Sequence, residues 1–180
     1  MLADAYKRWR HTRGYGVHSP FAFRIVNEVI REPRGYRYYG YDETDAAGAS
    51  GSRRIRRMAR MLLRLAACLD VRSAFVAGSE VSAVYSAALR CARSGMIISG
   101  SPADIDRCRL ICTTAGAVSP ASLCSLLSTP GRIMQLSDVS DGLADALFEA
   151  LQQGVMFRSG SDVLIIARDG MQKISYTVFF

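Results

Sequence analysis

The sequence has no run of 18 consecutive apolar residues, which excludes a transmembrane helix of ordinary length. Its first residues, MLADAYKRWRHTR, carry charges where a signal peptide has an apolar segment. Charged residues make up only 22% of the chain and hydrophobic residues 49%, a balance typical of globular proteins. We therefore expect a cytoplasmic protein that does not insert into a membrane.

The chain also lacks any pair of cysteines with CxxC spacing, and its five cysteines are an odd number. The two histidines, His11 and His18, are far from all of them in sequence, which argues against a zinc site. We expect free, mostly buried thiols, with two of them on one face of a helix over 101–116. The five are Cys68, Cys91, Cys108, Cys112 and Cys124, of which Cys108 and Cys112 are that pair.

The net charge of +7 is placed almost entirely in the first third of the chain. Residues 1–64 hold 14 Lys/Arg and 6 Asp/Glu, whereas residues 65–180 hold 9 and 10. Such asymmetry indicates either a surface for nucleic-acid phosphates or a solvated helix face. The candidate phosphate contacts are Arg53, Arg54, Arg56 and Arg57. Tyrosines just upstream are candidates for base stacking, namely Tyr36, Tyr38, Tyr39 and Tyr41.

Two regions are predicted from the pattern of helix signals and breakers. Residues 1–52 form a helical extension and a linker, with a helix that starts at Ser19 as N-cap and Pro20 as first residue. The polar, Gly- and Tyr-rich stretch 33–52 is predicted to be a loop. Residues 53–180 form the main domain.

From residue 53 the chain alternates helices with short apolar strands, which predicts an α/β fold with a mostly parallel sheet covered on both faces. The predicted strands are 73–78, 95–99, 132–137, 161–167 and 173–180. The predicted helices are 52–70, 80–93, 101–116, 119–131 and 140–154. The last strand is apolar enough to need a partner, either inside the sheet or across a homodimer.

Four stretches of sequence resemble those of a known family. RGYGVHSPFAF is similar to a GxGxHSPF signature, and FVAGSEVS, IISGSPADI and SDVLIIARD match the ends of a first, second and fifth strand. Together they resemble a bacterial group of class I S-adenosylmethionine-dependent methyltransferases with a helical N-terminal extension. The resemblance implies a Rossmann-like sheet and a cofactor site at the carboxyl ends of its strands. Residues 65–180 are short for the family's seven strands, so we expect a reduced sheet.

The resemblance also implies where S-adenosylmethionine would bind. The family has an acidic residue and two glycines around the first strand end, where this chain has Val76 and Ser82 beside its one glycine. Ser99 stands where the family has a carboxylate for the ribose hydroxyls, so we expect weak cofactor binding, with Glu80 as one replacement. The implied cofactor-binding residues are Gly78, Ser79, Glu80, Ser99, Gly100 and Ser101.

Catalytic residues are not evident, and no metal is expected. Asp138, Asp141 and Asp169 follow strands as metal ligands do in some family members, but their positions also suit helix starts and turns. The sequence thus favours a degenerate methyltransferase-fold protein, a pseudoenzyme with weak or no catalysis that binds a small molecule or a protein. Two alternatives stay open: an active methyltransferase on RNA or a small molecule, and a nucleic-acid-binding module.

Overall fold

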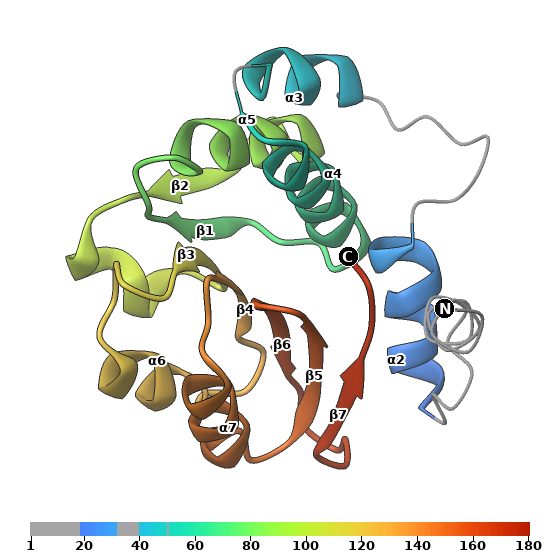
Figure 1. Cartoon of the computed structure of the whole chain (residues 1–180), viewed down its shortest axis with the longest axis vertical. Helices are drawn as coiled ribbons and strands as arrows, with labels where there is room; N and C mark the ends of the chain where they lie inside the picture. The colour runs from blue at the N-terminus through green and yellow to red at the C-terminus, as the bar shows by residue number, and fades with distance from the viewer. Residues whose placement is uncertain (1–18, 32–39, 50) are drawn as a thin grey trace.

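The structure is a computed structural model and describes residues 19–31, 40–49 and 51–180. A seven-stranded sheet carries helices on both faces, in a Rossmann-like α/β arrangement (Figure 1). The strands are β1 (Ser73–Val76), β2 (Ile97–Ser99), β3 (Leu110–Thr114), β4 (Ile133–Ser137), β5 (Gly154–Ser159), β6 (Asp162–Ala167) and β7 (Ile174–Thr177). The helices are α2 (Pro20–Arg24), the π-helix η1 (Ile25–Ile30), α3 (Tyr41–Ala47), α4 (Arg53–Cys68), α5 (Ser82–Ala92), the 3-10 helix η2 (Pro102–Arg107), α6 (Pro120–Leu126) and α7 (Asp141–Ala150).

The sheet has the strand order β2-β1-β3-β4-β6-β5-β7. Strand β1 pairs in parallel with β2 and β3, and β3 pairs in parallel with β4. Strand β6 runs antiparallel to both of its neighbours, β4 and β5, whereas β7 pairs in parallel with β5. Six strands therefore point one way and β6 alone is reversed, so the mostly parallel sheet predicted from the sequence is confirmed.

Two hydrophobic cores lie on opposite faces of this sheet. Helices α4, α5 and η1 cover one face, with Leu62, Leu65 and Leu89 fully buried among their side chains. Helices α6 and α7 cover the other face with Leu123 and Leu147. Helix α3 packs on the outside of α4 and α5, away from the sheet (Figure 1).

Serine caps determine where several helices begin. Ser52 Oγ accepts a hydrogen bond from Ile55 N at 3.2 Å at the start of α4, and Ser140 Oγ accepts one from Leu143 N at 3.3 Å at the start of α7. Ser19 caps α2 in the same way, with Pro20 as its first residue. The predicted starts of these helices are confirmed.

One predicted helix, 101–116, is wrong. Its first part forms η2, and its second part is the central strand β3, so Cys108 and Cys112 do not share a helix face. Leu110, Ile111 and Cys112 are fully or almost fully buried because β3 is covered on both faces. A short apolar run of this kind lacks the periodicity that separates a strand from a helix. All five cysteines are free thiols.

The predicted strand 161–167 is present as β6, but its reversed direction was not foreseen, and β5 was missed. β5 and β6 form a hairpin whose pairing ends at Ser159 and Asp162. At the start of β5, Gly154 has φ 135, and a Cβ there would lie 2.2 Å from the carbonyl oxygen of Ile166. Strands β3 and β5 together bring the five predicted strands to seven, so the expectation of a reduced sheet is wrong.

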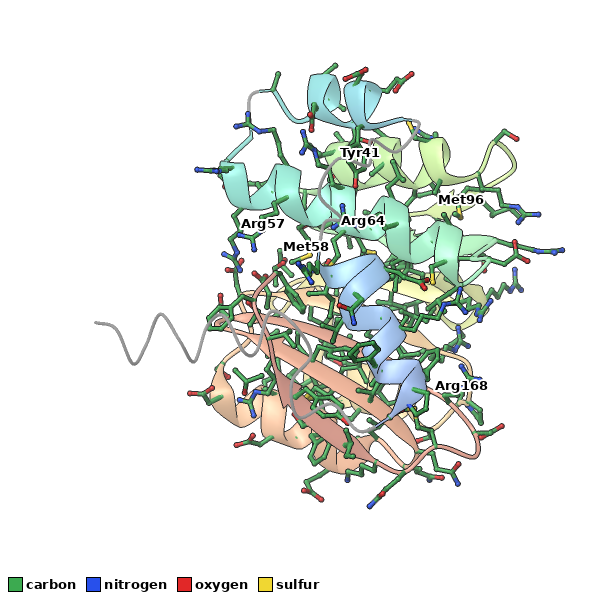
Figure 2. All side chains as sticks on the ribbon, turned by 90° about the vertical axis from the view of Figure 1, so that its right-hand side faces the viewer. Tyr41, Arg57, Met58, Arg64, Met96 and Arg168 are labelled. Carbon is green, nitrogen blue, oxygen red and sulfur yellow. The ribbon has the colours of Figure 1, made fainter. Side chains whose placement is uncertain are left out.

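The predicted loop 33–52 contains a helix, α3, which begins after Gly40 at φ 90. Tyr41 is only 3% exposed, and Arg64 of α4 donates hydrogen bonds to its hydroxyl and, at 2.8 Å, to the carbonyl oxygen of Val29 (Figure 2). Tyr41 is therefore not free to stack on a base, and the other three tyrosines lie outside the described residues.

No helix in the described ranges is both long enough and apolar enough to cross a bilayer. The predicted boundary at residue 52 stays a prediction, although α2, η1, α4 and the sheet contribute to one continuous core.

Candidate functional site

A cleft of about 410 Å³ opens at the carboxyl edge of the sheet, where β1, β3 and β4 end. Helix α4 contributes its first turns to one wall, and the reversed strand β6 contributes its first residue, because β6 begins at the edge where its neighbours finish. The lining residues are Ser52, Arg54, Ile55, Met58, Ser79, Glu80, Val81, Tyr85, Thr114, Gly116, Ser137, Asp138 and Asp162. In parallel sheets this edge is where ligands bind.

The turn between β1 and α5 depends on Gly78. Its φ of 124 lies in a region that other residues rarely adopt, and an added Cβ would lie 3.0 Å from Val81 Cγ2. The carbonyl oxygen of Gly78 accepts hydrogen bonds from Val81 N at 3.3 Å and from Ser82 N at 3.0 Å, which closes the turn. The next two residues, Ser79 and Glu80, line the cleft.

The end of β2 is organised differently from the end of β1. Ser99, Gly100 and Ser101 are not among the residues that line the cleft, although β2 pairs with β1 and an added Cβ at Gly100 would lie 3.4 Å from the carbonyl oxygen of Val76. Ser99 Oγ donates to Asp104 Oδ2 at 2.8 Å and accepts from Ser101 N at 3.1 Å. A carboxylate, Asp104 of η2, therefore lies beside Ser99, at the position where the sequence resemblance implies a carboxylate. Asp104 was not identified as a candidate from the sequence. The available signal was its place in the first turn of a helix that begins with Ser101 and Pro102.

Arg54 bridges the cleft with four hydrogen bonds. Its Nε and Nη2 donate to the two carboxylate oxygens of Asp162 at 2.9 and 2.7 Å, and its Nη1 donates to Asp138 Oδ1 at 3.0 Å. Nη2 also donates to Ser161 Oγ at 3.0 Å. The hydrogen bond to Asp162, and to a lesser extent the one to Asp138, raises the pKa of Arg54 above its already high usual value. The guanidinium is therefore charged at every pH at which the protein is folded.

Asp138 takes a backbone conformation that is rare for a residue with a side chain. Its φ is 60, directly after β4. Asparagine and aspartate tolerate this left-handed region better than other residues, at a modest cost. The next residue, Val139, donates its N–H to the carbonyl oxygen of Ser161 at 2.9 Å, which fixes the loop against the β5–β6 hairpin. The Asp138 carboxylate is thereby held facing Arg54.

A polar floor lies under the cleft. Tyr85 of α5 is buried, and burial raises the pKa of its hydroxyl well above the usual value, although a hydrogen bond with Ser137 acts in the opposite direction. Tyr85 is therefore a neutral hydrogen-bonding group and not a general base. Gln135 Nε2 donates to Ser137 Oγ at 2.9 Å, while Gln135 Oε1 is buried with no hydrogen-bond partner among the described residues.

The cleft carries excess negative charge. The charged side chains that line it are the carboxylates of Glu80, Asp138 and Asp162 and the guanidinium of Arg54, which gives a formal net charge of −2. These four side chains alone favour a cation over an anion of the same shape, whereas Arg53 and Arg57 add positive charge in the adjoining cavity.

The three aspartates considered as metal ligands do not come together. Asp141 begins α7 and accepts a hydrogen bond from Arg158 at 2.9 Å. Asp169 follows β6, which ends at the opposite edge of the sheet from Asp138, because β6 is reversed. The described residues contain no group of three or more His, Cys, Asp or Glu side chains that could hold a metal ion.

The four candidate phosphate contacts on α4 divide into two sets. Arg54 is held by Asp138 and Asp162, whereas Arg53, Arg56 and Arg57 line a second cavity of about 300 Å³ with Arg60 and Asp45. His18 and most of the GxGxHSPF-like signature lie outside the described residues. Comparison with protein-family models, with curated proteins and with solved structures found no match to the chain.

Proposed function

We propose that this chain is a methyltransferase-type protein that binds S-adenosylmethionine or a related adenosyl sulfonium weakly in the carboxyl-edge cleft, with weak or no methyl transfer. The observation that carries the proposal is a net-negative cleft beside the Gly78 turn, at the edge of the sheet where class I methyltransferases hold their cofactor.

The strand order supports this proposal. In class I methyltransferases one strand runs antiparallel to the others. It lies between two parallel strands, in the half of the sheet that does not contain the second strand of the chain. In this chain β6 occupies the corresponding place between β4 and β5.

The cleft's charge favours the sulfonium form of the cofactor. S-adenosylmethionine carries one more positive charge than S-adenosylhomocysteine, and Glu80 supplies a carboxylate next to the turn. One unit charge at this kind of partly solvated site is worth on the order of 1 kcal/mol, or about a fivefold ratio of dissociation constants. The low affinity follows from the missing carboxylate at Val76 and from the serine, in place of a carboxylate, at position 99.

Isothermal titration calorimetry of the full chain tests the proposal. We expect a dissociation constant between about 10 μM and 1 mM for S-adenosylmethionine, and about fivefold weaker binding of S-adenosylhomocysteine. Glu80→Gln should bring this ratio close to one. Gly95→Ala is the matched control, because a Cβ at Gly95 meets no atom within 4 Å, and it should leave both constants unchanged. Equal binding of the two ligands by the unmodified chain, or no saturable heat at 2 mM ligand, contradicts the proposal.

An active methyltransferase is the second candidate, and Asp104 is the observation that favours it. With Asp104 beside Ser99 and Glu80 beside the β1 turn, carboxylates are present near both strand ends. A dissociation constant below about 10 μM, weakened at least tenfold by Asp104→Asn, would support the enzyme over the binding protein.

A further inference from the structure

The first two turns of α4 carry a group of arginines that the cleft does not use. We call Arg53, Arg56 and Arg57 the arginine face; they line the cavity of about 300 Å³ next to α3. Figure 2 shows Arg57 in this first half of α4, while Arg64 lies further along the helix beside Tyr41. Residues three and four apart share one side of a helix, so the three side chains are neighbours.

The charges of the arginine face are not compensated within the described part of the chain. Arg60 of the same cavity is paired with Asp45, and Arg54 is paired with Asp162 and Asp138. Arg53 and Arg57 are exposed and have no acidic partner in the described ranges, and Arg56 reaches only the carbonyl oxygen of Ala49, at 3.4 Å. Three like charges within five residues repel one another, and a bound polyanion removes this repulsion.

An aromatic side chain adjoins the arginine face. A further cavity of about 200 Å³ is lined by Arg53, Arg57, Met58 and Phe180, together with Arg54 and Asp162. A cationic groove next to an aromatic ring is the combination that proteins use for single-stranded nucleic acid, because phosphates contact the cations while a base stacks on the ring. A membrane surface fits less well, because Phe179, next to Phe180, is the one large hydrophobic residue exposed near this site in the described ranges, and α4 exposes none.

We propose that the arginine face binds the phosphate backbone of single-stranded nucleic acid, with a base next to Phe180. The site does not depend on the ligand proposed for the cleft. Arg54 also lines the cavity beside Phe180, but Asp162 and Asp138 hold its guanidinium, so it is not counted among the phosphate contacts. Of the four arginines that the sequence offers as phosphate contacts, the proposed site keeps three, and it adds a contact with an aromatic ring.

Fluorescence anisotropy with the full chain and labelled 15-nucleotide oligo(U) or oligo(dT) tests the proposal. Three phosphate contacts predict that log K falls with log[salt] with a slope of about −2, or roughly 20-fold between 50 and 200 mM NaCl. Removing two contacts with Arg53→Ser/Arg57→Ser should reduce the slope to about −0.7 and weaken binding about 25-fold at 100 mM NaCl. An oligonucleotide of abasic sites should bind at least about fivefold more weakly than oligo(dT) if a base stacks.

The matched control is Arg90→Ser/Arg107→Ser, which removes the same charge from two exposed arginines that line neither arginine cavity. It should change the slope little, and melting temperatures should show that both double variants fold. Equal losses in the two double variants, no binding by the unmodified chain at 50 mM NaCl, or binding to phosphatidylserine vesicles without binding to either oligonucleotide would overturn the proposal.

Discussion

Replacing Arg54 with methionine is expected to destabilise the fold measurably, although Arg54 is a surface residue by most criteria. The substitution keeps a long unbranched side chain but removes all four hydrogen bonds to Asp162, Asp138 and Ser161. The main cost is expected at Asp162, because its side chain is only 9% exposed and its carboxylate loses both of its guanidinium hydrogen bonds.

The expected loss of unfolding free energy follows from how exposed the side chains of Arg54 and Asp162 are. Breaking a fully buried ion pair costs about 3–5 kcal/mol, whereas a fully exposed pair contributes about 0–1 kcal/mol. Arg54 is 48% exposed and Asp162 is 9% exposed, so we expect an intermediate cost of about 2 kcal/mol. For a chain of this length that corresponds to a decrease in melting temperature of about 4–8 °C. The pair with Asp138, whose side chain is 64% exposed, should contribute less than about 0.5 kcal/mol.

A double-mutant cycle with urea unfolding measures these terms separately. Arg54→Met combined with Asp162→Asn should give a coupling free energy of about 1.5 kcal/mol, and the same cycle with Asp138→Asn less than about 0.5 kcal/mol. Arg53→Met is the control, because the neighbouring arginine has no carboxylate partner in the described ranges. The reasoning is refuted if Arg54→Met costs no more than Arg53→Met, or if the coupling to Asp138 exceeds the coupling to Asp162.

Three further outcomes are expected. Gly154→Ala should cost at least about 3 kcal/mol in the free energy of unfolding, because its Cβ would lie 2.2 Å from the carbonyl oxygen of Ile166, while Gly142→Ala, with open space around it, should not; urea unfolding distinguishes them. Cys112 should resist Ellman's reagent at pH 8 until the chain unfolds, because complete burial raises the pKa of its thiol; fast reaction of all five thiols in the native state would contradict this. The hydrogen bonds from Arg72 and Arg93 lower the pKa of Asp70 in the folded chain. The ionised Asp70 carboxylate therefore stabilises the fold at pH values above its unfolded-state pKa, and this stabilisation is lost as the pH falls through the lower, folded-state pKa. The melting temperatures of Asp70→Asn and of the unmodified chain should therefore converge in acid, and a difference that widens there would contradict this prediction.

Local chemistry in the sequence was sufficient to predict several helix starts and the first strand. A serine followed by proline or by a helix-forming stretch satisfies the first N–H groups of a helix from within a few residues, as Ser19, Ser52 and Ser140 do. The turn after β1 was equally visible, because Gly78 follows an apolar run and precedes a helical pattern.

Features that depend on distant partners were not visible. The run Leu110–Thr114 is a strand because β1 and β4 flank it, and its own sequence is equally compatible with a buried helix. The direction of β6 depends on its pairing with β5, and residues 155–160 were assigned to no predicted helix or strand. Arg54 was grouped with its neighbours on α4 because nothing local reveals that its partner, Asp162, lies 108 residues further along the chain.

The reversal of β6 also determines which connection of the chain adjoins the cleft at the carboxyl edge of the sheet. Its first residue, Asp162, lines the cleft and is preceded by a two-residue hairpin loop, Gly160 and Ser161, so this side of the cleft adjoins a tight turn rather than a connection between a strand and a helix. Residues inserted into this turn would change the width of the cleft entrance, while the βα connections on the opposite side of the cleft keep their lengths.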